Sequence, residues 1–258
     1  MLVSDKEKFI FFHVPKAGGT SIHIKLKERY GWTDDPPPVL HHMKAKDYLE
    51  FFPNKAEYFK FAIVRNPFDR LLSAWSDFTQ NRLVGRIQNN YKTFLQSKGL
   101  WEDDTLCIYR MWETDPKQFE SYDDFHSHYK QAYDWNIDGK PLSYFDILAD
   151  VDGGKFLKIK KNKGFDYFCE QFVDSGWSRD IHFLPQTDVI GDIPDYIGKV
   201  ETIKSDMEYI SDRVGFDLTI GHDRKSNHRH YREMYTPKTR KIIEEHFAKD
   251  LETYGYEF

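Results

Sequence analysis

Short apolar runs predict three buried strands along the chain. The first covers Lys8–Val14, where charged residues precede the run and Pro15 follows it. The second covers Tyr58–Val64, and a shorter candidate covers Tyr196–Val200. Runs of this length, bounded by charge or proline, are typical of strands whose two faces are both covered.

Apolar residues spaced three or four positions apart predict helices after these strands. One helix begins near Ser21, and a second opens at Asn66-Pro67, an N-cap followed by proline at the first helical position. A third ends at Gly215, a C-terminal stop signal, and the last opens at Thr236-Pro237. Their apolar stripes are Ile22, Leu26 and Tyr30; Leu71, Leu72, Trp75 and Phe78; Ile203, Met207, Ile210 and Val214; and Ile243, Phe247 and Leu251.

Strands that alternate with helices predict an α/β fold, a mostly parallel sheet covered by helices on both faces. A chain of 258 residues with 40% apolar residues suits a single domain, residues 1–258. We expect its core in residues 8–82 and 186–258, and a variable region of mostly helices and long loops over about 83–185. Ligands of such sheets bind at the carboxyl ends of the strands, where the loops after the first two strands lie.

Composition narrows the classes of partner. The formal net charge of −5 argues against a nucleic-acid binder, which is normally basic. Mean hydropathy is −0.71, and no apolar run approaches the roughly 18 residues of a membrane span. Two cysteines, Cys107 and Cys169, are too few for a disulfide framework or a metal cluster, and the sequence leaves open whether they form a single bridge. There is no Asn-x-Ser/Thr site, which fits a reducing compartment.

The segment Phe11–Ser21 reads strand, small-residue loop, helix start. Gly18 and Gly19 allow backbone N–H groups to approach an anion closely, and the helix N-terminus adds partial positive charge. Lys16 adds a full charge, and Thr20 and Ser21 offer hydroxyl donors. These features describe a phosphate cradle, although not a Walker A loop, in which the lysine follows the last glycine. The alternative is a tight strand-to-helix turn with an incidental lysine.

The second segment, Ala62–Ser73, brings an arginine to the end of a buried strand. Arg65 suits a phosphate because its planar guanidinium donates two parallel hydrogen bonds. Ser73 lies eight residues later, about two helical turns away. Asp69 falls in the first helical turn, where a carboxylate offsets the helix dipole. The alternative is a capped helix that carries a surface arginine.

Together the two segments resemble the sulfotransferases that use 3′-phosphoadenosine 5′-phosphosulfate (PAPS), in particular the carbohydrate branch (2-O-, chondroitin and HNK-1-type enzymes) and its bacterial relatives. Pro15–Ser21 is similar to the family's 5′-phosphosulfate loop, and Arg65–Ser73 to its 3′-phosphate motif, R-[ND]-P-x-x-R-x-x-S. Three later segments also resemble family segments: Asp180–Gln186, Ile197–Thr202, and His230 through the C-terminal helix.

The resemblance implies a P-loop-like parallel sheet flanked by helices in a single domain with helical and loop insertions. It also implies PAPS as co-substrate, with adenosine 3′,5′-bisphosphate (PAP) as product, and requires no metal. Lys16 would stabilise the charge that develops on the leaving phosphate oxygen. Arg65 and Ser73 would hold the 3′-phosphate. The 5′-phosphosulfate would be held by Pro15, Lys16, Ala17, Gly18, Gly19, Thr20 and Ser21.

A hydroxyl acceptor requires a general base, and the resemblance points to a histidine between the first helix and the arginine-bearing strand. His42-Met-Lys-Ala-Lys-Asp47 aligns with H-A-T-A-[RK]-[ED] of the bacterial relatives, so His42 is the first candidate and its neighbour His41 the second. The alternative is that these are polar loop histidines. His13, in the first strand, is expected to be a core histidine, and Pro185-Gln186 to line the site by resemblance.

The resulting hypothesis is a PAPS-dependent sulfotransferase, an enzyme that transfers a sulfuryl group in line to a hydroxyl, such as that of a carbohydrate or glycan. The alternatives are an ATP-dependent P-loop-like kinase and a non-catalytic glycan-binding protein on the same fold. The chain begins seven residues before its first predicted strand. We therefore expect a soluble, cytoplasmic protein with no membrane span; a trimmed catalytic domain from the Golgi lumen is the other possibility.

Overall fold

A computed structural model describes most of the chain, which forms two compact units. The first unit comprises residues 1–73, 184–233 and 243–258, and the second comprises residues 74–183 and 234–242. The described residues are 1–30, 44–79, 105–109, 136–137, 140–141, 156–160, 164–174, 178, 181–220 and 229–258.

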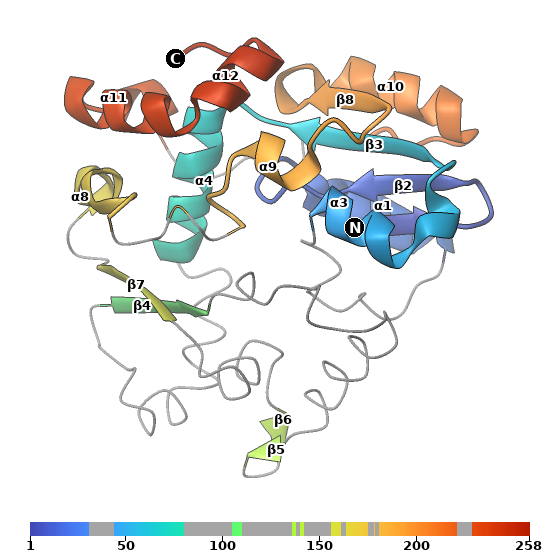
Figure 1. The fold of residues 1–258 in the computed structure, drawn as a ribbon, viewed down its shortest axis with the longest axis horizontal. Helices are drawn as coiled ribbons and strands as arrows, with labels where there is room; N and C mark the ends of the chain where they lie inside the picture. The colour runs from blue at the N-terminus through green and yellow to red at the C-terminus, as the bar shows by residue number, and fades with distance from the viewer. Residues whose placement is uncertain are drawn as a thin grey trace. The chain divides into compact units, whose positions relative to one another are not determined.

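The first unit is built on a four-stranded sheet in the order β1-β2-β3-β8 (Figure 1). β2 (Phe9–Phe12), β3 (Phe59–Val64) and β8 (Tyr196–Lys199) are parallel to one another and confirm the three strands expected from the sequence. β1 (Leu2–Ser4) was not expected; it pairs antiparallel with β2. The mostly parallel sheet with flanking helices confirms the α/β fold class.

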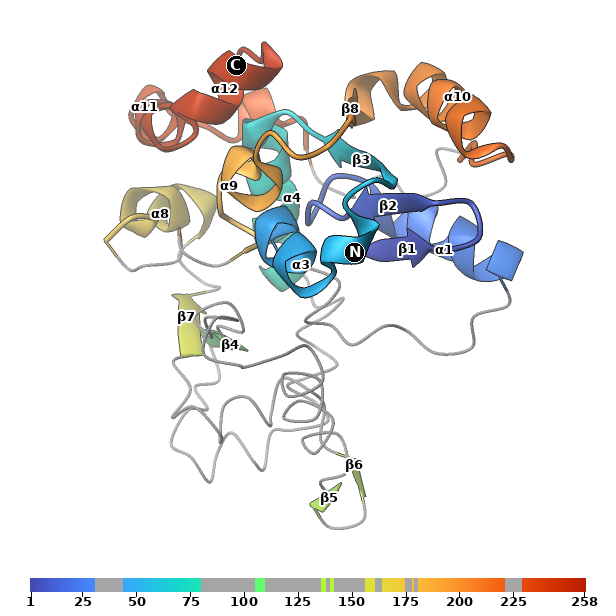
Figure 2. The ribbon, with the colours of Figure 1, turned by 45° about the vertical axis from the view of Figure 1, so that its right-hand side comes forward.

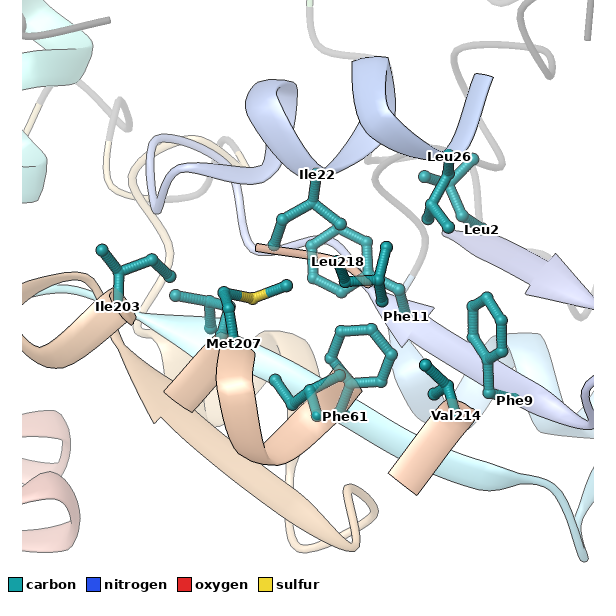
Figure 3. Close-up of a cluster of buried hydrophobic side chains, with 12 residues drawn as sticks. Leu2, Phe9, Phe11, Ile22, Leu26, Phe61, Ile203, Met207, Val214 and Leu218 are labelled. Carbon is teal, nitrogen blue, oxygen red and sulfur yellow. The ribbon is translucent and has the colours of Figure 1, made fainter. Parts of the chain in front are cut away.

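One face of the sheet is covered by α1 (Gly19–Tyr30) and α10 (Ile203–Val214), both expected from their apolar stripes (Figure 3). Side chains alternate across a strand, so Phe9 and Phe11 of β2 face this cluster. The cluster also holds Leu2, Ile22, Leu26, Phe61, Ile63, Ile203, Met207, Ile210, Val214 and Leu218, all buried. This burial fixes the register of the sheet, because a slip of one residue would turn the strand members of the cluster, such as Phe9 and Phe11, to the other face and away from α1 and α10.

The opposite face carries α3 (Ala45–Phe51), whose Tyr48 ring meets Phe12 of β2 edge-on at 6.3 Å. α3 contacts α9 (Gln186–Ile190), which in turn contacts α12 (Ala248–Tyr254). Figure 1 and Figure 2 both show α3 and α9 side by side. The sequence had not predicted α3. Its seven residues show no extended apolar stripe that would distinguish them from a loop.

Helix ends follow the sequence signals, with one correction. α4 (Pro67–Thr79) begins after Asn66, whose Oδ1 accepts a hydrogen bond from the Phe68 N–H at 3.0 Å. α10 ends at Gly215 with φ of 78°, in the left-handed region. The single C-terminal helix predicted from Thr236 is wrong: the chain forms α11 (Pro237–His246) and then α12, with a bend at Phe247. Main-chain hydrogen bonds continue through the bend, so the apolar spacing that suggested one helix is preserved.

The second unit contains two antiparallel strand pairs and a helix. β4 (Thr105–Tyr109) pairs with β7 (Phe156–Lys160), and β5 (Asn136–Ile137) pairs with β6 (Lys140–Pro141). α8 (Gly164–Gln171) packs Phe165 against Trp75 at 5.1 Å between ring centroids. The expectation of mostly helices and loops for this region had not included the strands. Short 3₁₀ helices lie at Pro53–Lys55, Val200–Thr202 and Tyr231–Glu233.

Among the described residues, no helix is both long enough and apolar enough to cross a membrane.

Candidate functional site

The two segments singled out in the sequence meet at the carboxyl ends of β2 and β3. Nη1 of Arg65 donates a hydrogen bond to the main-chain oxygen of Lys16 at 3.3 Å. Nε of Arg70 donates to the main-chain oxygen of Pro15 at 3.0 Å. Residues about 50 positions apart therefore form one site, as the parallel pairing of the two strands requires.

The loop between β2 and α1 has the backbone of an anion cradle. Lys16 has φ of 66° and Gly18 has φ of 76°, both in the left-handed region. A non-glycine residue there costs roughly 1–3 kcal/mol, and such strain is concentrated at functional sites. α1 begins at Gly19, so the N–H groups of its first turn have no acceptor within the helix. Among the described residues, a Cβ atom at Gly18 would lie 3.8 Å from Val200 Cγ2, an ordinary van der Waals contact.

Gly19 is required for a different reason, the close approach of a buried ring. A Cβ atom at this position would lie 2.1 Å from Cδ2 and 2.2 Å from Nε2 of His13. The His13 side chain is 8% exposed and stacks on Phe11 with 5.9 Å between ring centroids. This position agrees with the expectation of a core histidine, and it makes His13 a support for the loop.

Arg65, which lies just before α4, is held in a defined orientation by the carboxylate of Asp69 in the first turn of that helix. Its Nε and Nη2 lie 2.8 and 2.7 Å from Oδ2 of Asp69. The Arg65 side chain is 13% exposed. Ser73 lies one further turn along the same helix face and is 5% exposed. The four-residue spacing therefore places Asp69 and Ser73 on one face of α4, the face that follows Arg65.

The main chain of Arg65 is clamped by Gln186. Oε1 of Gln186 accepts from the Arg65 N–H, and Nε2 of Gln186 donates to the Arg65 oxygen, each at 2.9 Å. The Gln186 side chain is fully buried. The expectation that Gln186 lines the site is therefore wrong. Its side-chain amide forms the hydrogen bonds that a neighbouring strand would otherwise offer to the main-chain N–H and oxygen of Arg65. No spacing along the sequence predicts this contact, because the two residues are 121 positions apart.

Arg70, the second arginine of the Arg65–Ser73 segment, is a structural residue. It is fully buried, and besides Pro15 it donates from Nη1 to the oxygen of Leu184 at 2.8 Å. The guanidinium therefore ties the cradle loop to the segment that leads into α9. The second arginine of the R-[ND]-P-x-x-R pattern was the available signal, but the sequence did not indicate its partners.

Glu201 joins the start of α4 to the C-terminal segment. Its Oε1 accepts from the Asn66 N–H at 2.8 Å, and its Oε2 accepts from the Tyr256 hydroxyl at 2.7 Å. Burial, together with this carboxylate, raises the pKa of Tyr256 above its ordinary value. Nδ2 of Asn66 donates to the oxygen of Glu257 at 2.8 Å. The segments that resembled the family's later motifs therefore position the residues around Arg65.

The model of the sulfotransferase family (Sulfotransfer_2) matches residues 1–257. The chain belongs to the sulfotransferase family. It is 35% identical over 89 residues to carbohydrate sulfotransferase 10 of Gallus gallus, a match that covers 30% of this chain and 25% of that protein. The proteins of the same name from Danio rerio (34% over 94 residues, 31% and 26% covered) and Homo sapiens (34% over 89 residues, 30% and 25% covered) are similar. No solved structure matches.

Membership of the sulfotransferase family confirms the resemblance drawn from Pro15–Ser21 and Arg65–Ser73. The matched stretch spans about a quarter of the length of these curated relatives. His41 and His42, the expected general bases, lie outside the described residues, which resume at Lys44. Within the described part of this sulfotransferase, no group of three or more His, Cys, Asp or Glu side chains is placed to hold a metal ion.

Proposed function

We propose that this chain transfers a sulfuryl group from PAPS to a hydroxyl of a carbohydrate. The observation that carries the proposal is the hydrogen bond from Arg65 to the main chain of Lys16. It joins Pro15–Ser21, which would bind the 5′-phosphosulfate of the nucleotide, to Arg65–Ser73, which would bind its 3′-phosphate. Membership of the family supports the reaction class.

The residues of the cradle fit the 5′-phosphosulfate. Gly18 is exposed, and the loop leads directly into the N-terminus of α1, whose positive end favours an anion, although the Ser21 N–H donates to the Gly18 oxygen at 3.2 Å. The Lys16 ammonium is the full positive charge of this loop. We assign it the stabilisation of charge that builds on the phosphate oxygen as the S–O bond breaks, an interaction stronger in the transition state than in the ground state.

Arg65 and Ser73 fit the 3′-phosphate. Asp69 holds the Nε and Nη2 edge of the Arg65 guanidinium, and Nη1 donates to the Lys16 oxygen, so the group is fixed beside the cradle loop, where we assign it the contact with the 3′-phosphate. The Ser73 hydroxyl lies two turns along α4 and supplies a further donor. A site for this phosphate distinguishes PAPS and PAP from nucleotides that carry only 5′-phosphates.

In the proposed step, a bond forms between the acceptor oxygen and sulfur as the bond between sulfur and the phosphate oxygen breaks. The acceptor proton passes to a base, for which we retain His42, with His41 as the alternative. Positioning and electrostatics supply most of the rate enhancement in such transfers. His42→Ala should abolish transfer with unchanged PAP affinity, and His41→Ala is the matched control; the reverse outcome reassigns the base to His41.

A carbohydrate acceptor is supported by the relatives named carbohydrate sulfotransferase 10. Acceptor choice is tested by incubating the enzyme with PAPS and a panel of neutral and acidic glycans. Transfer of the sulfuryl group to at least one glycan is expected, and transfer only to non-carbohydrate hydroxyls would overturn this part of the proposal.

The donor is tested by calorimetric titration with PAP, 5′-AMP, and ATP with Mg²⁺. We expect the wild type to bind PAP more tightly than 5′-AMP, because only PAP carries the 3′-phosphate. Arg65→Ala should weaken PAP binding toward the level of 5′-AMP and leave 5′-AMP binding unchanged. Equal PAP affinity in wild type and variant would overturn the assignment of Arg65, and binding of ATP alone would overturn the donor.

A further inference from the structure

A buried carboxylate outside the two nucleotide segments holds the start of α9. Asp250, on α12, is fully buried. Its Oδ2 accepts from the Gln186 N–H at 2.7 Å, and its Oδ1 accepts from the N–H and the hydroxyl of Thr187 at 2.8 and 2.9 Å. Three donors compensate the buried charge, and such charge-assisted hydrogen bonds are about twice as strong as neutral ones.

The residue held in this way is the one that clamps Arg65. Gln186 is the first residue of α9: its N–H bonds to Asp250, and its side-chain amide bonds to both main-chain groups of Arg65. Hydrogen bonds thus hold both the main-chain N–H and the side-chain amide of Gln186, and the residue is fully buried. The three residues form a continuous chain of hydrogen bonds from α12 to the end of β3.

We propose that Asp250 is a positioning residue for the nucleotide site, acting through Gln186 on the main chain of Arg65. This inference rests on the proposed function. The Arg65 guanidinium has to meet Asp69 and the 3′-phosphate at once, so a small displacement of its main chain misaligns both contacts. Loss of the Asp250 carboxylate therefore weakens binding of the 3′-phosphate and leaves the contacts with the 5′ end of the nucleotide in place.

The test is a double-mutant cycle on PAP affinity. Asp250→Asn keeps the shape but turns an NH₂ group toward a main-chain N–H, and Gln186→Met keeps the volume but removes both bonds to Arg65. We expect each variant to raise the Kd for PAP about tenfold, and the double variant to raise it about tenfold as well rather than a hundredfold, since both act through one route. The Kd for 5′-AMP should change less than about twofold in all three.

Matched controls separate positioning from general stability. Glu252→Gln removes the same charge from an exposed position on the same helix and should leave the PAP Kd unchanged. Thr187→Val removes only the hydroxyl bond to Asp250 and should shift the PAP Kd in the same direction by a smaller factor, which keeps the proposal testable if Asp250→Asn does not fold.

The outcomes are distinct. A folded Asp250→Asn variant with a lower melting temperature but the wild-type PAP Kd would show that Asp250 is structural only. Independent, multiplying effects of the two substitutions would show that Asp250 does not act through Gln186. Absence of PAP binding in the wild type would instead overturn the proposed function, and the positioning role with it.

Discussion

The imidazole of His13 occupies the space in which a side chain at Gly19 would lie, with 2.1 Å between a Cβ atom there and ring Cδ2. Gly19 opens α1 and the ring is buried beside Phe11, so neither partner moves without disturbing the core. This contact couples the packing of the sheet to the shape of the cradle.

Gly19→Ala should therefore destabilise the protein by about 2 kcal/mol or more, the cost of overpacking a well-filled site. Among the described residues, Gly18→Ala meets Val200 at an ordinary contact distance, so it should cost about 1 kcal/mol, from its left-handed backbone. Urea denaturation of each variant measures these differences. Adding His13→Ala to Gly19→Ala should recover part of the loss; strictly additive losses would show that the ring is not the obstacle.

Lys16 combines a strained backbone with the proposed catalytic charge, so two substitutions separate stability from activity. Lys16→Gly removes the amine and relieves the left-handed conformation, whereas Lys16→Ala removes the amine and keeps the strain. We expect the glycine variant to be more stable than the alanine variant by about 1 kcal/mol. Sulfuryl transfer should fall by about 100-fold or more in both.

Thermal denaturation and sulfuryl-transfer assays on the same Lys16 preparations give both quantities. Wild-type transfer rates in Lys16→Gly would refute the catalytic role of the ammonium.

Arg70→Met should leave the buried oxygen of Pro15 and the partly buried oxygen of Leu184 without their donors. An unsatisfied buried acceptor costs about 1–3 kcal/mol, so the free energy of unfolding should fall by about 2–5 kcal/mol. Arg240→Met, at an exposed position on α11, is the control and should change stability by less than about 0.5 kcal/mol. Equal effects of the two substitutions would contradict the bracing role of Arg70.

Glu7 gives the first unit a pH-dependent contribution to stability. Burial is the largest single influence on its pKa and raises it, but hydrogen bonds from Ser4 and Tyr30, with Lys6 and Arg29 nearby, together lower the pKa below its ordinary 4.5. The unfolded chain therefore binds this proton at higher pH than the folded protein. The stabilisation is present above the unfolded pKa and is lost as the pH falls through the folded pKa.

The difference in unfolding free energy between wild type and Glu7→Gln should thus be largest near about pH 7 and shrink below about pH 4.5. Urea titrations across this range measure it. Tyr30→Phe removes the 2.6 Å hydrogen bond from the tyrosine hydroxyl to Glu7 and should raise the pKa of Glu7 in the folded protein. The stabilisation by Glu7 should then be lost at a higher pH. A difference that stays constant with pH would show that the hydrogen bonds do not favour the ionised form.

Local signals in the sequence were sufficient for most of the core and for selecting the two candidate site segments. Continuous apolar runs gave β2 and β3, the Asn66-Pro67 pair marked the start of α4, and Gly215 marked the end of α10. These features succeed because they depend on residues within a few positions of one another. The glycines, lysine and arginine of the two segments could be assigned for the same reason, since their chemistry follows from residue type and from position after a strand.

The partners of those residues were decided only by the tertiary structure. Gln186 contacts Arg65 across 121 residues, Glu201 contacts Asn66 across 135, and Asp250 contacts Gln186 across 64. A buried amide or carboxylate takes whichever donors the fold brings to it, and no spacing along the chain encodes that choice. The sequence by itself therefore determined β2, β3, β8 and the apolar faces of α1, α4 and α10, together with the two segments proposed to bind anions, whereas the packing of α9 and α12 decided what holds Arg65 in place.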